Sequence, residues 1–94
     1  MFLPPIEGKL PAGDVVMTQG ALLALEEEDV FQGLVRHLSC DWGEVDEHDW
    51  QENDAALEYG HRLLSQYRDR NGTKFWIITE HDRSVTTILL PEEY

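Results

Sequence analysis

The C-terminal third of this 94-residue chain carries three consecutive runs of β-branched and aromatic residues. Such residues favour strands. The three runs lie at 62–68, 73–80 and 85–90. Short polar segments at 69–72 and 81–84 separate them, and both segments have the composition of tight turns. Segment 61–94 is therefore predicted to form an antiparallel β-meander.

The middle run of the three predicts a central strand. With a side-chain period of two, Phe75, Ile77 and Thr79 share one face, whereas Trp76 and Ile78 share the other. Both faces are partly apolar, as is typical of a strand that has neighbours on both sides.

The preceding segment, 14–60, is predicted to be mainly helical. A short β-type run at 14–18 comes first, and Thr18 can then N-cap a short helical piece. Asp29 is the predicted N-cap of the clearest amphipathic helix. The apolar residues of that helix recur at spacings of one, three and four and share one face; they are Val30, Phe31, Leu34, Val35 and Leu38.

A third helix is expected to begin at Asp46 or Glu47 and to end at Gly60, which suits the C′ position. Its apolar stripe is thin, so most of the helix should lie in solvent with Trp50 as its anchor. The remaining members of the stripe are Ala56 and Leu57.

The length of the chain fits one domain with one core. Residues 1–13 contain three prolines and two glycines and are expected to form an extended arm. A single domain then covers 14–94, mainly helical and acidic over 14–60 and built of antiparallel strands over 61–94. The predicted fold class is α+β, with two to three short helices packed on a three- to four-stranded antiparallel sheet.

The negative charge of the chain is concentrated in its helical half. The chain has 19 acidic and seven basic residues, a net charge of −12. Segment 26–58 holds twelve of the acids against one base, Arg36, which leaves a local net charge of −11. The twelve acids are Glu26, Glu27, Glu28, Asp29, Asp41, Glu44, Asp46, Glu47, Asp49, Glu52, Asp54 and Glu58.

A segment of this charge is expected to bind a basic protein and to repel nucleic acid and anionic membranes. Carboxylates along helices with almost no basic partner four residues away destabilise those helices, so solubility alone explains the excess incompletely. The alternative interpretation is a merely solvated acidic face, which is what charge runs usually are.

The cellular location is expected to be the cytoplasm. Cys40 is the only cysteine, so no intrachain disulfide can form and nothing indicates an oxidising compartment. The first residues lack the basic and apolar regions of a signal peptide, and no apolar run approaches the roughly 18 residues that a membrane span needs.

Two groups of residues contain side chains of the kinds that bind metals. His37-x-x-Cys40, with Asp41 and His48 nearby, offers the donor types of a zinc site, but no second cysteine completes the usual paired spacing. Segment 41–49 is unlike a calcium-binding loop because its glycine stands third instead of sixth. No metal and no cofactor are therefore predicted, and Cys40 is expected to be packed.

A nuclease-like enzyme is a third hypothesis. Glu80-His-Asp-Arg-Ser84 contains residue types used in acid–base and nucleophilic catalysis. Neighbouring residues of one turn rarely converge on a substrate, so a turn with local hydrogen bonds is favoured and no catalytic residue is assigned. A ribonuclease would use His81 and Arg83 with the basic residues of the strands, but a net charge of −12 opposes RNA binding. Those basic residues are Arg62, Arg68, Arg70 and Lys74.

Four segments carry a pattern found in a group of small bacterial proteins. They are Gly13-Asp-Val-Val-Met-Thr, Arg36-His-Leu-Ser-Cys-Asp-Trp-Gly-Glu, Gln51-Glu-Asn and Lys74-Phe-Trp-Ile-Ile-Thr-Glu-His-Asp-Arg-Ser-Val-Thr-Thr-Ile-Leu-Leu-Pro-Glu-Glu-Tyr94. Over 13–94 the chain resembles a family encoded on plasmids, prophages and integrated elements. Its members are often labelled plasmid-related proteins, or subunits of a type I restriction–modification system.

The restriction-subunit label does not fit the chain. A methylating subunit needs a nucleotide-cofactor fold and an Asn/Asp-Pro-Pro-aromatic motif, and this chain has neither the length nor the motif. The resemblance implies a mobile-element context and no agreed catalytic residues. Small acidic proteins of such elements often look like DNA mimics that block defence proteins, including CRISPR effector complexes and restriction enzymes.

The leading hypothesis is a non-enzymatic mobile-element protein whose acidic helical face, 26–58, binds a basic host-defence protein. An anti-CRISPR or anti-restriction inhibitor is its most concrete form. A regulator or adaptor of the element that acts through apolar contacts is the alternative. In the leading hypothesis the partner is a nucleic-acid-binding protein. The chain itself is expected to contact neither nucleic acid nor membrane.

Overall fold

A computed structural model of the chain describes residues 10–94. Within this range the elements follow in the order β1 (Asp14–Met17), α1 (Gln19–Ala24), α2 (Glu27–Leu38), α3 (Glu47–Tyr59), β2 (Leu63–Arg68), β3 (Lys74–Thr79), β4 (Val85–Leu89) and a final 3-10 turn, η1 (Pro91–Glu93). The predicted α+β class and the C-terminal meander are confirmed. None of the helices in residues 10–94 is long and apolar enough to cross a lipid bilayer.

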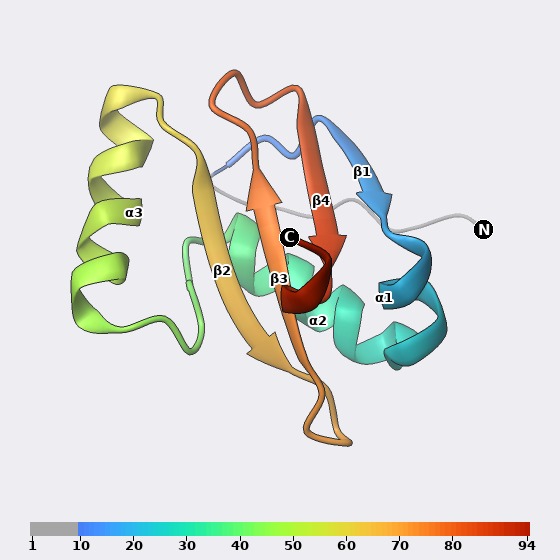
Figure 1. Cartoon of the computed structure of the whole chain (residues 1–94). Helices are drawn as coiled ribbons and strands as arrows, with labels where there is room; N and C mark the ends of the chain where they lie inside the picture. The colour runs from blue at the N-terminus through green and yellow to red at the C-terminus, as the bar shows by residue number, and fades with distance from the viewer. Residues whose placement is uncertain (1–9) are drawn as a thin grey trace.

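The four strands form one mixed sheet in the order β1-β4-β3-β2 (Figure 1). The meander pairs β2 with β3 and β3 with β4 in antiparallel fashion. The prediction of a wholly antiparallel sheet is wrong at β1, because Asp14 to Met17 pair in parallel with Val85 to Ile88 of β4. A parallel pair needs a long crossover connection, and all of the chain between β1 and β4 supplies it here.

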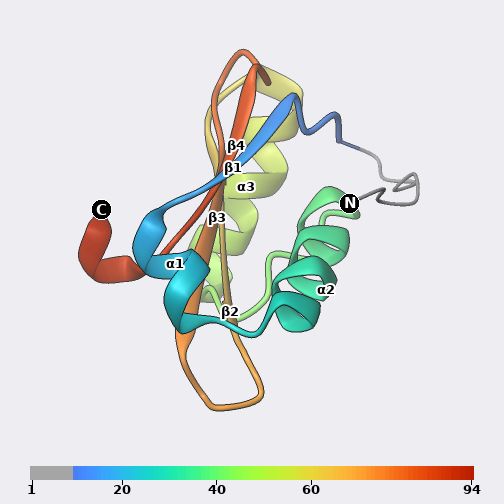
Figure 2. The ribbon, with the colours of Figure 1, turned by 90° about the vertical axis from the view of Figure 1, so that its right-hand side faces the viewer.

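The core lies between the sheet and α2. Alternate residues of β2 and β3 face α2, and the predicted shared face of Phe75, Ile77 and Thr79 is fully buried. From α2, Val30, Leu34 and Leu38 close the core from the other side. Figure 2 shows the sheet edge-on, with α2 on one side and η1 on the other.

The start of α2 differs from the prediction. Glu26, and not Asp29, is the N-cap residue, and it makes no side-chain capping hydrogen bond. Asp29 lies in the first helical turn, where its carboxylate accepts hydrogen bonds from the backbone N–H and the guanidinium of Arg70. A partner 41 residues away along the chain therefore determines the role of Asp29.

The other predicted helix ends are confirmed. The Thr18 hydroxyl accepts a hydrogen bond from the Ala21 N–H at 3.2 Å, at the start of α1. The Asp46 carboxylate accepts one from the Asp49 N–H at 2.8 Å, at the start of α3. Gly60 ends α3 in the left-handed region with φ 73°, which a glycine adopts without steric cost.

Helix α3 is held against the outer edge of β2 by a polar contact that the sequence analysis missed. The Asn53 side-chain amide donates to the Leu64 carbonyl oxygen at 2.7 Å and accepts from the Leu64 N–H at 3.2 Å. Trp50 is only half-buried and Leu57 is exposed. Asn53 and Ala56 are the buried residues of α3, and Trp50, the predicted anchor, packs partly buried against the core.

The Asn53 contact should dominate the attachment of α3. Replacing Asn53 by alanine leaves the outward N–H and C=O of Leu64 without partners, and such a loss costs about 1–3 kcal/mol. We expect the free energy of unfolding in urea to fall by about 2 kcal/mol. Hydrogen exchange should also accelerate selectively at the Leu64 amide. The variant Gln51→Ala on the exposed side of α3 is the control, and an equal loss of stability in both variants would contradict this account.

Candidate functional site

The twelve acidic residues of segment 26–58 lie in three places and not on one face. Four lie at the start of α2, two lie in the connection between α2 and α3, and six lie on α3 or at its N-cap. Figure 1 shows α3 beside β2, at the opposite edge of the sheet from β1. The charge that is continuous in the sequence is therefore divided in the structure.

The acids at the start of α2 are partly neutralised by Arg70 from the β2–β3 turn. The Arg70 guanidinium lies 3.0 Å from the Asp29 carboxylate and 3.2 Å from the Glu28 carboxylate. Hydrogen bonds from Arg70 lower the pKa of Asp29 below its ordinary value. Glu26 and Glu27 make no ion pair with any Lys or Arg in residues 10–94.

Both acids of the α2–α3 connection are paired with arginines. Arg36 at the end of α2 lies 2.9 Å from the Asp41 carboxylate, and this hydrogen-bonded pair lowers the pKa of Asp41. Arg68 of β2 lies 2.8 Å from the Glu44 carboxylate. These acids therefore carry little free charge for a partner.

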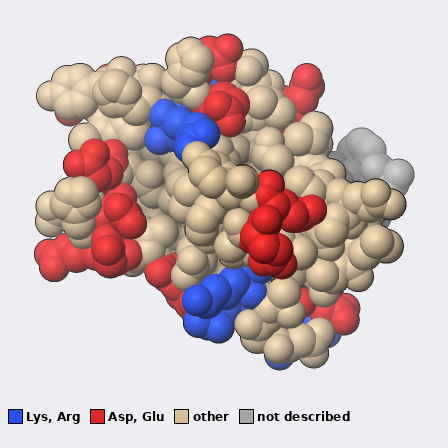
Figure 3. Space-filling model, viewed as in Figure 1, with Lys and Arg blue, Asp and Glu red and all other residues tan. Residues whose placement is uncertain are grey.

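Helix α3 carries acidic side chains that no Lys or Arg of the described chain pairs with. We call this group the α3 acidic surface; its members are Asp46, Glu47, Asp49, Glu52, Asp54 and Glu58. All six residues are exposed, and Figure 3 shows acidic side chains gathered over α3 at the left of the molecule. The only basic group on the helix is His48, whose ring lies 3.6 Å from the carboxylates of Asp49 and Glu52.

The helical period arranges the α3 acidic surface in rows. Glu47, Asp54 and Glu58 are seven and four residues apart, so they follow one another along one flank of the helix. Glu52 lies on the opposite flank with His48. Asn53 and Ala56 occupy the buried stripe between these flanks. The attachment to β2 therefore turns both charged flanks toward solvent.

The spacing of these charges is close to that of a nucleic-acid strand. Six carboxylates are spread over 13 helical residues and the N-cap, which span about 21 Å at a rise of ~1.5 Å per residue. This gives one charge per ~3.5 Å, whereas one strand of duplex DNA carries one phosphate per ~3.4 Å of helix axis. Counted over both flanks, the charge per unit length of α3 is therefore similar to that of a phosphate backbone.

The charge does not stabilise the helix as a whole. Glu47 and Asp49 lie in the first turn, where a negative charge interacts favourably with the helix dipole. Glu58 lies in the last turn, where the same interaction is unfavourable, and that turn contains no basic residue. Helix stability therefore does not explain the acid at this end.

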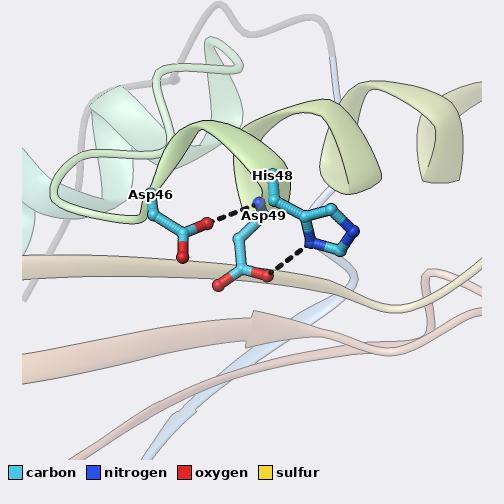
Figure 4. A group of neighbouring side chains, drawn as sticks. All are labelled: Asp46, His48 and Asp49. Carbon is cyan, nitrogen blue, oxygen red and sulfur yellow. Dashed lines mark hydrogen bonds and ion pairs between the residues drawn. The ribbon is translucent and has the colours of Figure 1, made fainter.

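One cluster on α3 has the donor types of a metal site (Figure 4). One ligand atom from each of Asp46, His48 and Asp49 lies within 4.8 Å of the others. All three residues are exposed, and Asp46 already serves as the N-cap through the Asp49 N–H. Exposed acidic groups with this spacing are common without a metal, so we assign none here.

The candidate zinc ligands do not form a metal-binding group within residues 10–94. His37 is fully buried, and its ring nitrogens lie 2.6 Å from the Ser65 hydroxyl and 2.9 Å from the Thr79 hydroxyl. Burial lowers the pKa of His37 to about 4, so the ring is neutral near pH 7. Cys40 is half-buried and packs against the core, whereas His48 is exposed on α3.

The segment between β3 and β4 forms a locally hydrogen-bonded turn, as expected. The Asp82 carboxylate accepts hydrogen bonds from the Ser84 N–H at 3.0 Å and from the Ser84 hydroxyl at 2.6 Å. Arg83 donates to the carbonyl oxygens of Ala56, His61 and Glu80. Its guanidinium therefore ties the turn to the end of α3, and this geometry does not favour a nuclease role for Arg83.

The sequence offered one signal for the residue that positions the α3 acidic surface. Asn53 is three residues from both Trp50 and Ala56, which places it on the inner stripe of the helix. A polar residue on such a stripe needs a hydrogen-bonding partner. The partner itself, the edge of β2, could not be identified from the spacing.

No family model matches this chain. Searches of curated proteins and of solved structures likewise find no match.

Proposed function

We propose that this protein is a non-enzymatic binding protein that uses the α3 acidic surface to occupy a basic, nucleic-acid-binding surface of another protein. The observation that carries the proposal is the unequal neutralisation of the acids. Arginines pair with two of the four acids at the start of α2 and with both acids of the α2–α3 connection, but with none of the six acids of α3 in the described chain.

The proposed mechanism is electrostatic occlusion. A group of carboxylates that no Lys or Arg of the described chain neutralises attracts a positively charged groove from a distance and speeds the encounter. Once docked, the helix places carboxylates where phosphates would bind and so excludes the nucleic acid. Because the contact consists of exposed charges, raising the salt concentration should weaken it.

The resemblance to mobile-element proteins supports a particular partner class. Such elements encounter host defence, whose effector complexes and restriction enzymes have basic nucleic-acid-binding surfaces. We therefore infer an anti-CRISPR or anti-restriction inhibitor of the DNA-mimic type. Four acids of the predicted face would contribute less to binding than the acids of α3, because arginines of the same chain already pair with them. These four are Glu28, Asp29, Asp41 and Glu44.

Affinity capture with matched variants tests this proposal. The wild-type protein is compared as bait with Glu47→Lys/Glu58→Lys, which changes the net charge from −12 to −8. We expect a nucleic-acid-binding protein to be captured from bacterial lysate by the wild type. Capture by the double variant should fall by at least about tenfold, equivalent to ~1.4 kcal/mol.

The control is Glu26→Lys/Glu92→Lys, which makes the same change of net charge at exposed residues away from α3. It should capture the partner as the wild type does. Circular dichroism confirms that all three baits are folded. Equal capture by the two double variants would show that the position of the charge is irrelevant, and the proposal would then be wrong.

A further inference from the structure

The two edges of the sheet differ in whether their outward backbone groups have hydrogen-bonding partners in the described chain. At β2, the outward backbone groups of Leu64 bond to Asn53, and those of Gln66 bond to the Trp42 carbonyl oxygen and the Glu44 N–H. At β1, no strand of the described chain pairs with the outer side. An edge strand with unpaired groups is a template for another strand.

The hydrogen-bonding direction of β1 identifies the unpaired groups. Asp14 and Thr18 donate their N–H groups to β4, to the carbonyl oxygens of Ser84 and Ile88 at 3.0 Å each. Because this direction alternates along a strand, the backbone groups of Val15 and Met17 point to the outer side. Figure 2 looks onto this edge, with β1 in front of the sheet and α2 beside it.

An apolar groove adjoins the open edge. A pocket of about 230 Å³ lies between β1 and α2, and Val15, Met17, Phe31 and Leu34 contribute to its walls. A second hollow continues it toward α1 and is lined by Met17, Leu22, Leu25 and Glu27. Val15 is 45% exposed and Leu22 is 65% exposed, so apolar area remains accessible along the groove.

The charge of the groove distinguishes between possible occupants. Glu27 lines both hollows and is the only charged residue among their lining residues in 10–94. It makes no ion pair with any residue in 10–94. A second copy of this chain would bring another Glu27 and a net charge of −12 to the same place. A partner segment with a basic side chain would instead satisfy Glu27.

We propose that the outer edge of β1 and the groove beside α2 bind an extended peptide segment of a partner, which adds a fifth strand to the sheet. Alternate side chains of a strand point to the same side. The groove therefore selects apolar side chains at alternate positions, and Glu27 selects a lysine or arginine next to them. The site lies at the opposite edge of the sheet from α3 and does not rest on the proposed function.

A displayed library of linear decapeptides is the probe for this site. We expect the purified protein to enrich peptides with alternating apolar residues and at least one Lys or Arg. A synthetic peptide from that set should lose affinity by at least about tenfold on Val15→Pro, which removes an outward N–H without taking a bond from β4. Glu27→Lys should produce a loss of similar size.

Two matched controls separate the groove from the surrounding surface. Glu26→Lys makes the same charge change one residue away, outside the groove, and should leave the affinity unchanged. Leu23→Ser, at a residue 79% exposed and outside both hollows, should also have no effect, whereas Leu22→Ser should weaken binding. Circular dichroism verifies that each variant is folded.

Three results would overturn the proposal. They are the absence of any enriched peptide, peptides that bind the Glu27→Lys variant as tightly as the wild type, and a dimer in sedimentation that Val15→Pro dissociates. The last result would identify a second copy of the chain as the occupant of the edge.

Discussion

Replacing Gly43 by alanine is expected to lower the free energy of unfolding by about 3–4 kcal/mol. Gly43 has φ 75°, and a Cβ atom there would lie 2.1 Å from the Gln66 carbonyl oxygen and 2.7 Å from the Tyr67 ring. Relieving this overlap separates the loop from β2. The hydrogen bonds of Gln66 to Trp42 and Glu44 are then lost, and the fully buried Trp42 is displaced.

Gly60→Ala is the matched control for this prediction. Gly60 has φ 73°, but no atom lies within 4 Å of the position that its Cβ would take. Only the left-handed backbone conformation then carries a cost, which is about 1 kcal/mol. Urea denaturation of both variants measures the difference, and equal losses would show that close approach of the loop to β2 is unimportant.

His37→Ala is expected to destabilise the protein by about 3–4 kcal/mol. The ring is fully buried and links α2 to β2 and β3 through Ser65 and Thr79. Its edge-to-face contact with Trp42, at 5.6 Å between ring centroids, is lost as well. Alanine leaves a cavity and takes a partner from two buried hydroxyl groups, each of which is costly.

His37 should also make stability depend on pH. Burial lowers the pKa of the folded-state ring from 6.5 to about 4. Between these values the unfolded chain binds a proton that the folded chain excludes, so stability decreases as the pH falls from 6.5 toward 4. The loss contributed by His37 is about 3 kcal/mol over this interval.

The variant His37→Gln isolates this contribution, because glutamine does not titrate. Denaturation curves between pH 4 and pH 7 should show a weaker pH dependence in the variant than in the wild type. The acidic residues titrate in both proteins, so their contribution cancels in the comparison. An identical pH dependence would mean that folding does not lower the pKa of the His37 ring.

Features with a local signal were predicted well from the sequence. Thr18 and Asp46 cap their helices because a capping side chain bonds to an N–H three residues away. Gly60 ends α3 through its own backbone conformation. The faces of β3 follow from a period of two. Each of these features depends only on residues that lie close together in the sequence.

Features that depend on distant partners were not predicted. Asp29 has the composition of an N-cap but pairs with Arg70, and β1 has the composition of a strand but no signal for its parallel partner. The bond between Asn53 and the Leu64 backbone likewise joins separate elements. Such contacts are determined by the packing of elements and not by local propensity.

The candidate site likewise has a part that could be predicted from the local sequence and a part that depends on distant residues. The sequence identified the acidic segment 26–58 but could not separate paired from unpaired acids, because the neutralising Arg68 and Arg70 come from the β-meander. Only the folded chain narrows the candidate surface to α3.

Competition between this protein and nucleic acid tests the central claim most directly. The partner obtained by affinity capture is loaded with labelled DNA or RNA, and release of the label is followed as the protein is added. We expect one equivalent of wild-type protein to release the nucleic acid, and Glu47→Lys/Glu58→Lys to fail where Glu26→Lys/Glu92→Lys succeeds. A ternary complex in which the nucleic acid stays bound would contradict occlusion by the α3 acidic surface.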